Sequence, residues 1–380
     1  MNQFRRFVIC TAAWMPVFLA AATADVPDPA IVSSLAEAAT AAASIAAIRA
    51  RLDREVPPLL AAHKVPSVSI ALVRRGRVAL AGAWGQQSAG VPATDRTLYN
   101  IASLTKPLTA EVVLRLASNH AFSLDEPMAA YWTDPDIAND PRRLKLTPRL
   151  ALTHQTGFPN WRNRKTGLTF KRDPGEAYGY SGEGFEYLAA FVEKRTGQPF
   201  EVLAQAHLFD SVRMRRTAYT GRPWFEGAIA IPADAQGQPL KPHIAKRFSA
   251  ADLVYTTPRD YAAFLIAVWQ DQGLSPEIAR ERTHIHVSMM EDCQEGPAAP
   301  TCPPELGFGL GWEVAAFPGH TVLLHTGRDD GLYTVAVLDK TTGDGVVIFT
   351  NGQNGSEIAP ILLGLLEVDP VYLRFLQGQI

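Results

Sequence analysis

Apolar residues recur every three or four positions from residue 45 onward, which predicts an amphipathic helix that ends before Pro66. The positions on this helix face are Ile45, Ile48, Leu52, Val56 and Leu59. Two short apolar segments follow, at residues 67–73 and 77–84, and Arg75 and Gly76 lie between them as a turn. The pattern therefore predicts an opening helix packed beside an antiparallel hairpin.

Short apolar segments return near the C-terminus, where they predict an antiparallel meander and a closing helix. The four strands are expected at residues 307–314, 320–325, 331–339 and 346–350, and the helix at about residues 356–368.

The middle of the chain, from about residue 120 to 245, is rich in loops and short helical segments. One helix face there carries Phe185, Leu188, Phe191 and Val192. Gly197 is expected to end that helix. Further helices are expected to begin near Ser103 and to cover residues 258–269, the second with Thr257 as its cap.

These elements predict an α/β (α+β) fold in which an antiparallel sheet flanked by helices is built from both ends of the chain. The α/β part would comprise about residues 45–118 and 250–380, and an inserted, mainly helical domain about residues 119–249. Clefts between such parts are common ligand sites.

Residues 1–24 have the pattern of a secretory signal peptide. Arg5 and Arg6 supply the positive start, the following stretch is apolar, and small residues fit cleavage after Ala24. We therefore expect a periplasmic or secreted protein, with an uncleaved membrane anchor as the alternative. The Ala-rich segment 25–44 would be a tail or the start of a helix, and no later stretch is long and apolar enough to span a bilayer.

Charge and cysteine content limit the possible partners and the bonding of the cysteines. The 380 residues carry a formal net charge of −2 and no basic stripe, so no nucleic-acid partner is expected. Cys10 lies within the signal, which leaves Cys293 and Cys302 as an even pair in an oxidising compartment. They flank a Pro- and Gly-rich loop, so a local disulfide is expected, with two free thiols as the alternative.

The candidate chemistry begins with a Ser-x-x-Lys motif, Ser103 to Lys106, at a predicted helix start. Positions i and i+3 share a helix face, so the Lys106 ammonium can reach the Ser103 hydroxyl. Serine is a weak nucleophile that needs a nearby base or cation, and a helix N-terminus favours developing negative charge. Alone, this motif more often marks a capping serine beside a surface lysine.

Two further motifs follow along the chain. Tyr180 opens a Tyr-Ser-Gly motif just before the helix that Gly197 ends. A tyrosine held near a lysine ionises more easily than a free phenol and can act as a base. His325 opens a His-Thr-Gly motif at the end of an apolar strand, where the glycine lets backbone and substrate approach closely.

The order of these three motifs resembles that of serine β-lactamases, DD-peptidases of the penicillin-binding type and related esterases, and is most similar to the class C branch. The surrounding sequence agrees: residues 100–106 read NIASLTK, residues 152–159 LTHQTGFP, residues 184–200 end in TGQPF, and residues 325–333 read HTGRDDGLY. The resemblance covers roughly residues 45–366, which would form one β-lactamase-like serine hydrolase domain.

The resemblance implies a role for each residue. Ser103 would attack a carbonyl and form an acyl-enzyme, and Lys106 and Tyr180 would move its proton. The backbone N–H groups of Ser103 and Arg328 would form an oxyanion hole, in which each donor is typically worth ~3 kcal/mol. Water would then release the acyl group without a metal or another cofactor. The residues expected to line the substrate side are His325, Thr326 and Gly327.

Two departures from the family pattern argue against an efficient β-lactamase. The second motif ends in Gly182 where the family usually has Asn, which removes an amide that would bind a substrate's acylamino group. The third begins with His325 where class C enzymes usually have Lys, and a neutral imidazole attracts a carboxylate less than an ammonium does. Asp329 and Asp330 would add to this effect if they face the cleft, with Arg328 offsetting them.

Other candidate residues are weaker. A Lys-Thr-Gly sequence at residues 165–167 precedes Tyr180 in a polar segment, so it is interpreted as a loop turn. His284 and His286 have no matching acidic residues, and no metal site is expected. His154 is expected to make a structural hydrogen bond.

Three functions remain, each with a small-molecule partner. The first is hydrolysis of a carboxylic ester or small amide through an acyl-serine, which Gly182 and His325 favour. The second is a β-lactamase or DD-carboxypeptidase acting on cell-wall-type amides, which the expected export favours. The third is a non-catalytic penicillin-type binding module, which we would expect to have lost Ser103, Lys106 or Tyr180.

Overall fold

The computed structural model describes residues 29–296 and 299–379. The predicted signal peptide, its cleavage after Ala24 and Cys10 lie outside these residues. Helix α1 (Pro29–His63) contains the predicted first helix and begins within the Ala-rich segment. The chain divides after Ser44 into two compact units, and the second contains the sheet and all three motifs.

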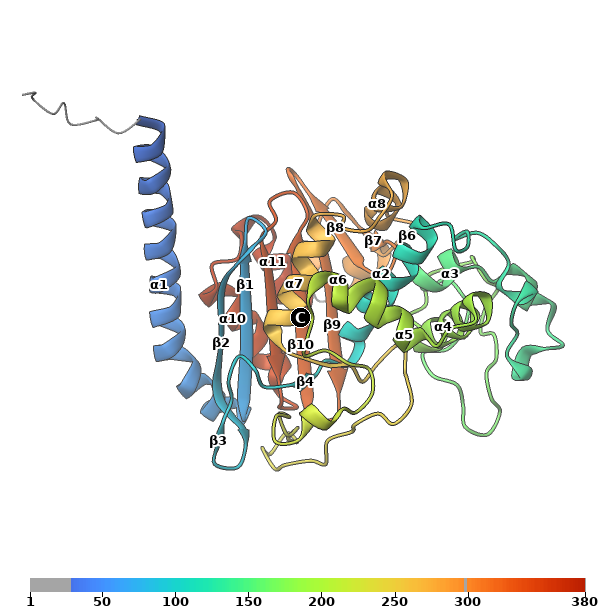
Figure 1. The fold of residues 1–380 in the computed structure, drawn as a ribbon, viewed down its shortest axis with the longest axis horizontal. Helices are drawn as coiled ribbons and strands as arrows, with labels where there is room; N and C mark the ends of the chain where they lie inside the picture. The colour runs from blue at the N-terminus through green and yellow to red at the C-terminus, as the bar shows by residue number, and fades with distance from the viewer. Residues whose placement is uncertain (1–28, 297–298, 380) are drawn as a thin grey trace, which may run out of the picture. The chain divides into compact units, whose positions relative to one another are not determined.

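Both ends of the chain contribute to one nine-stranded sheet with the order β3-β2-β1-β11-β10-β9-β8-β7-β6 (Figure 1). Strand β1 pairs antiparallel with β11, which joins the two ends and confirms the predicted fold class. The N-terminal strands are β1 (Ser67–Arg74), β2 (Arg77–Ser88) and β3 (Val91–Pro92). The C-terminal strands are β6 (Val287–Ser288), β7 (Glu305–Phe308), β8 (Glu313–Phe317), β9 (His320–Asp329), β10 (Leu332–Asp339) and β11 (Gly345–Thr350).

Each face of the sheet carries its own apolar core, and β1 alternates between them. Val68, Ile70 and Leu72 pack with the end of α1 and with α10 (Gly355–Leu365) and α11 (Pro370–Gln379). Ala71 and Val73 belong to the opposite core, with α2 (Thr105–Ser118) and α7 (Pro258–Trp269). Burial on both faces explains why these strands show nearly continuous apolar sequence.

Several predicted elements are confirmed, and two need correction. The first hairpin, α7 and the end of α4 (Gly182–Thr196) at Gly197 match the prediction. Residues 307–314 do not form one strand, because a turn separates β7 from β8 and Gly311 adopts a left-handed φ of +85° there. A second closing helix, α11, follows α10 and was not predicted.

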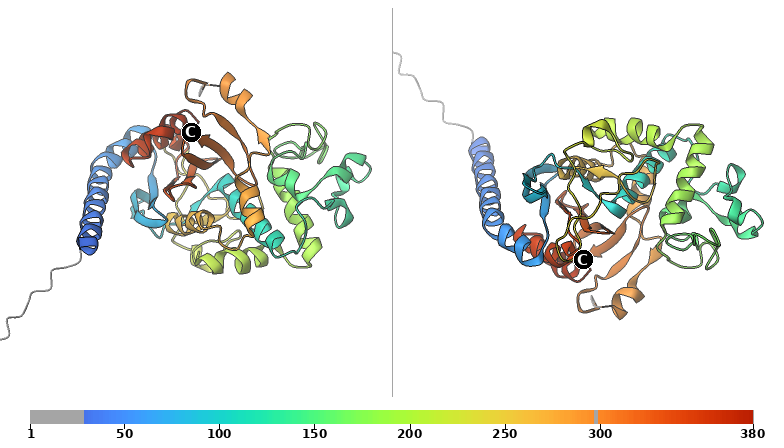
Figure 2. Two further views of the ribbon diagram at one scale, coloured as in Figure 1. Left: turned by 90° about the horizontal axis from the view of Figure 1, so that it is seen from above. Right: turned by 90° about the horizontal axis from the view of Figure 1, so that it is seen from below.

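The segment at about residues 119–249 is less helical than expected. Long loops interrupt it. Its helices α3 (Pro148–Leu152) and α4 (green) lie at the end of the sheet away from β1 and β2 (Figure 2). The loop after Phe225 instead contacts β2, where Gln87 Nε2 donates to the Gly227 carbonyl at 2.8 Å. Besides α3 and α4 the segment contains α5 (Phe200–Ala204), α6 (Asp210–Val212), the short 3-10 helices η2 (Met128–Ala130), η3 (Pro135–Ile137), η4 (Pro141–Lys145) and η6 (Pro223–Phe225), and the π-helix η5 (Gln205–Phe209). Its buried side chains join the core of α2 and α7, so the insert and the sheet share one core.

Six further short elements complete the described part of the chain. They are β4 (Tyr99–Asn100), β5 (Tyr255–Thr256), η1 (Ala102–Leu104), α8 (Pro276–Thr283), α9 (Met290–Glu295) and η7 (Ala299–Thr301). Cys293 and Cys302 form a disulfide with a Cα–Cα distance of 6.0 Å. Among the helices of the described ranges, none combines the length and the apolar character needed to cross a membrane.

Candidate active site

Ser103 lies in the middle of η1, the short 3-10 helix that leads into α2. Ala102 before it has a φ of +46°, a left-handed conformation that is uncommon for a residue other than glycine and is often found at functional sites. The Ala102 N–H donates to Asn100 Oδ1 at 2.9 Å, and Thr334 Oγ1 donates to the Ile101 carbonyl at 2.9 Å. The turn that presents Ser103 is therefore held by both β4 and β10.

Lys106 is fully buried on the first turn of α2. Its Nζ donates to Ser103 Oγ at 2.9 Å and to the Ala251 carbonyl at 3.0 Å, and both of these partners are uncharged. Burial lowers the pKa of Lys106 to about 8, although the charges of Asp252 and Glu186 oppose the shift. The amine can therefore lose its proton near neutral pH.

Tyr180 lies beside these two residues, with its ring centroid 4.8 Å from Lys106 Nζ. Burial raises the pKa of Tyr180, and this effect outweighs the lowering of the pKa by its hydrogen bond with Ser103. The easier ionisation expected from the sequence is therefore not found, and the phenol stays protonated at neutral pH. His154 makes the expected structural hydrogen bond: its Nδ1 accepts from the Ser181 N–H at 3.0 Å, and its ring lies 4.4 Å from that of Tyr180.

The third motif lies on β9, which passes directly beside η1. Pairing with β8 ends at Leu324, while pairing with β10 continues to Asp329, so one edge of β9 is open from His325 onward. A Cβ at Gly327 would lie 2.3 Å from the Ile101 carbonyl and 3.1 Å from Ser103 N. Only glycine lets the strand come this close to the turn that carries Ser103.

Side chains alternate along β9, so His325, Gly327 and Asp329 share the face toward Ser103. The other face carries Thr326, which is hydrogen-bonded to Tyr333, and Arg328, whose guanidinium lies 5.3 Å from the Tyr333 ring. Arg328 therefore does not offset Asp329 within the cleft, contrary to expectation. The side chain of Thr326 is likewise turned from the face where the sequence analysis expected it.

His325 is buried, and burial together with the Lys106 charge lowers the pKa of the imidazole to about 3. Its Nδ1 lies 2.7 Å from the Thr326 carbonyl. Because a carbonyl only accepts, Nδ1 must carry the proton and Nε2 must carry a lone pair. Nε2 is buried and has no hydrogen-bond partner among the described residues.

Two acidic residues next to Lys106 were missed by sequence reasoning. Glu186 on α4 accepts from Ser249 Oγ at 2.6 Å and from the Ala251 N–H at 3.2 Å, which positions the carbonyl that binds Lys106. Asp252 follows in the same loop, and burial and the charge of Asp329 raise its pKa to about 6. Neither belongs to a motif, so no sequence signal distinguishes them from ordinary surface carboxylates.

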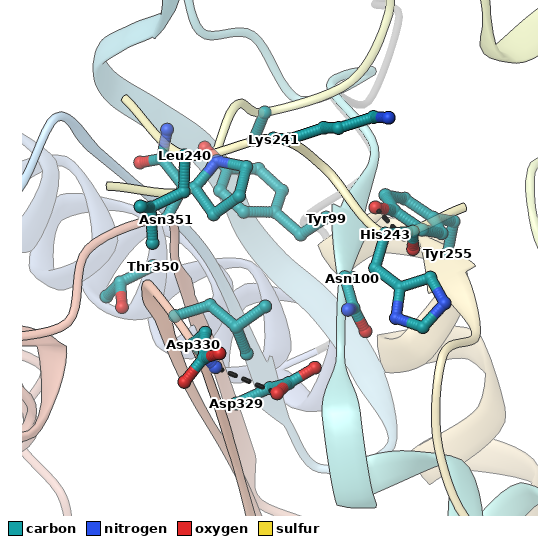
Figure 3. Close-up of a pocket in the computed structure, with 13 residues that line it drawn as sticks. Tyr99, Asn100, Leu240, Lys241, His243, Tyr255, Asp329, Asp330, Thr350 and Asn351 are labelled. Carbon is teal, nitrogen blue, oxygen red and sulfur yellow. Dashed lines mark hydrogen bonds between the residues drawn. The ribbon is translucent and has the colours of Figure 1, made fainter. Parts of the chain in front are cut away.

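A cavity of about 260 Å³ opens at the end of β9, next to the turn into β10 (Figure 3). Asn100, Tyr255 and Asp329 are among its lining residues, and Figure 3 shows the Asp329 side chain directed toward Asn100. The exposed Asp330 donates its N–H to the Asp329 carboxylate at 2.8 Å. Asn100 also holds Ala102, so the cavity adjoins the Ser103 turn.

The other candidates lie elsewhere. Residues 165–167 form a turn in which the Gly167 N–H donates to the Asn163 carbonyl at 2.8 Å. His286 Nε2 contacts the Glu281 carbonyl at 3.0 Å. Within residues 29–296 and 299–379, no three metal-binding side chains of His, Cys, Asp or Glu are grouped so as to hold an ion.

Known proteins resemble this chain over most of its length. The family model described as Beta-lactamase matches residues 52–365. Esterase EstB of Burkholderia gladioli is 24% identical over 393 residues, which cover 87% of this chain and 96% of that protein. The D-alanine carboxypeptidase AmpC from Burkholderia cenocepacia superposes with a TM-score of 0.67 at 22% identity, covering 83% of this chain and 98% of that one. The octameric penicillin-binding protein homologue from Pyrococcus abyssi gives a TM-score of 0.70 at 20% identity, covering 83% and 76%.

Proposed function

Because the chain belongs to the Beta-lactamase family and is a serine hydrolase, we propose that it hydrolyses a carboxylic ester or a small amide through an acyl-enzyme on Ser103. The observation that supports this most is the 2.9 Å hydrogen bond from the buried Lys106 Nζ to Ser103 Oγ. We also propose that residues 1–24 direct export to the periplasm or the medium, as their composition suggests.

In the acylation step, neutral Lys106 is the base. Ser103 Oγ bonds to the substrate carbonyl carbon while its proton passes to Lys106 Nζ. The protonated Tyr180 donates its proton to the leaving oxygen or nitrogen as that bond breaks, and Lys106 returns a proton to Tyr180. The direction of the two pKa shifts supports these assignments, because burial favours a neutral amine and a protonated phenol alike.

The negative charge on the carbonyl oxygen is stabilised by the backbone N–H groups of Ser103 and Arg328, each worth ~3 kcal/mol in comparable sites. The close approach at Gly327 supports this pairing of η1 with β9. In the second step, water attacks the acyl carbon and gives up a proton to Lys106. Ser103 Oγ regains a proton as its bond to the acyl carbon breaks, which releases the free acid.

Two observations favour an ester or small amide over a β-lactam. A Cβ at Gly182 would lie 2.8 Å from the Trp161 ring, so this position has no room for the Asn of the family motif unless the ring moves. His325 is neutral, so it lacks the charge that attracts a substrate carboxylate.

The test is turnover of p-nitrophenyl acetate by the wild type, by Ser103→Ala and by a control, Ser288→Ala, at an exposed serine. We expect Ser103→Ala to lose several orders of magnitude in kcat/KM with an unchanged circular dichroism spectrum, and the control to keep full activity. Equal turnover by Ser103→Ala would exclude the proposed nucleophile, and no turnover by the wild type would contradict the assignment as an ester hydrolase.

Intact mass measurement after adding benzylpenicillin separates the related functions. No adduct supports the ester or amide assignment. A lasting adduct on Ser103 would indicate a penicillin-binding peptidase, and a transient one with ring-opened product would indicate a β-lactamase.

A further inference from the structure

We propose that the substrate carries an aromatic ring close to its scissile bond, and that Trp161 binds this ring beside Tyr180. The enzyme would then hydrolyse aromatic esters or amides in preference to aliphatic ones of the same size. This inference rests on the proposed function and names the substrate class of the same site.

The indole of Trp161 lies on the same side of the chain as the Tyr180 phenol. Ser181 has an extended backbone, with a φ of −146° and a ψ of 114°, so the side-chain directions at Tyr180 and Gly182 agree and that of Ser181 is opposite. The Ser181 hydroxyl points inward, where it donates to the Pro159 carbonyl at 2.7 Å. A Cβ at Gly182 would lie 2.8 Å from the indole. The ring therefore covers the place of a side chain directed toward the cleft.

The residues on both sides of Trp161 are hydrogen-bonded to the first turn of α4. The Gly182 N–H donates to Asn160 Oδ1 at 2.9 Å, and the Glu183 N–H donates to the Asn160 carbonyl at 3.0 Å. The Arg162 guanidinium pairs with Glu183 at 2.8 Å, and the Arg162 N–H donates to the same carboxylate at 3.0 Å. The indole is therefore positioned before any ligand binds, which lowers the entropic cost of binding.

Trp161 is nevertheless open to solvent. It is 47% exposed, and every other tryptophan within residues 29–296 and 299–379 is buried or half-buried. Trp84 and Trp312, by contrast, belong to the two cores. A single exposed apolar side chain is ordinary on a protein surface. This one lies beside the catalytic tyrosine, where a bound substrate would cover it.

The chemistry of the indole favours an aromatic partner. Aromatic rings pack in offset or edge-to-face arrangements that are more favourable than contact with an aliphatic group of equal area. The polar groups beside the ring are engaged within the protein, because Asn160 Oδ1 accepts from Gly182 and the Glu183 carboxylate is paired with Arg162. The apolar ring is thus the surface that remains for the substrate.

The experiment uses two isomeric esters that place one benzyl group on opposite sides of the scissile bond. Methyl phenylacetate carries it on the acyl side and benzyl acetate on the alcohol side. Each is compared at pH 7 with its cyclohexyl analogue, methyl cyclohexylacetate or cyclohexylmethyl acetate, and acid release gives kcat/KM. We expect one aromatic ester to exceed its analogue about fivefold, which is the gain that an aromatic pair provides. That ester shows which side of the bond lies on Trp161.

The variants locate the preference. Trp161→Leu, which keeps an apolar side chain and removes the aromatic face, should lower the ratio of aromatic to cyclohexyl kcat/KM about fivefold. The matched control is Tyr131→Leu, at an aromatic residue of similar exposure that packs on Phe191 instead. It should keep the ratio within about twofold. Methyl acetate has no group to place on the indole, so its kcat/KM should be unchanged in both variants.

Two outcomes overturn this inference and leave the proposed function intact, provided that Ser103 is still required. One is the absence of an aromatic preference in both pairs of esters. The other is a ratio that is the same in the wild type and in Trp161→Leu. Failure of every ester to react, methyl acetate included, would contradict the proposed function, and this inference with it.

Discussion

Two buried cations contact the same central helix, α2, and their surroundings are opposite. Arg282 is fully buried and forms ion pairs with Glu111 on α2, at 2.9 Å, and with Asp271, which also binds Lys340 at 2.7 Å. Lys106, at the start of α2, is equally buried, but its hydrogen bonds go to a hydroxyl and a carbonyl, both uncharged. The first charge is neutralised by its neighbours and the second is not.

The difference separates a structural cation from a reactive one. A neutralised guanidinium stabilises the fold only as part of its network, and removing one partner leaves a buried charge. An ammonium without a direct carboxylate is favoured to lose its proton, and the pKa of about 8 for Lys106 reflects that. Burial alone therefore does not identify a catalytic residue; burial without a compensating charge does.

The largest expected effect is the loss of activity in Lys106→Met, which keeps an unbranched side chain as far as Cε and removes the amine. We expect kcat/KM for p-nitrophenyl acetate to fall about 10³-fold, as is typical when a general base is removed. The melting temperature should be unchanged or raised, because no buried charge needs desolvation. Lys171→Met, at an exposed lysine, is the control, and activity within tenfold of wild type would contradict the role of Lys106.

For Arg282→Met we expect a loss of stability with little change in activity, the reverse of the outcome for Lys106→Met. The free energy of unfolding, measured with urea, should fall by about 3–5 kcal/mol because Glu111 is left buried and charged. Activity per folded molecule should stay near that of the wild type. Adding Glu111→Gln should recover part of the stability, and a folded but inactive Arg282→Met protein would break the distinction between the two cations.

The smallest effect is a shift in the pH profile of Asp252→Asn. Wild-type kcat/KM for a neutral ester should rise with pH through about 8 as Lys106 loses its proton. The Asp252 charge holds the Lys106 pKa up, so its removal should move the profile to lower pH and increase the rate below pH 7. Asp330→Asn should leave the profile in place, and a shift to higher pH would show that Asp252 acts in another way.

Much of the fold could be predicted from the sequence, because the periodicity of apolar residues reflects local structure. The hairpin of β1 and β2 and helix α7 with its Thr257 cap match the predicted elements. The break between β7 and β8 within residues 307–314 was not predicted, because apolar residues continue through the turn at Gly311. Such a turn is specified by backbone conformation, which an apolar pattern does not encode.

Some residues of the candidate site could likewise be predicted from the sequence, and others could not. Ser103, Lys106 and Tyr180 were found because each belongs to a short motif, and the structure brings all three together. Asp252 was missed because its proximity to Lys106 depends on a loop held in place by Glu186, from a helix far away in sequence. The lone pair on His325 Nε2 depends on a single ring-to-carbonyl contact, which residue identity does not reveal.

The pairing of Val68 with Thr350 has a consequence for the folding of the chain during its synthesis. The first hairpin emerges early during synthesis, but its neighbour in the sheet is among the last strands to appear. Contacts between such distant parts of a chain form slowly, because a long loop must close before they contribute. The Ser103 turn itself depends on Thr334. A growing or C-terminally shortened chain therefore contains the nucleophile without its support, and the enzyme becomes competent only when its final strands are in place.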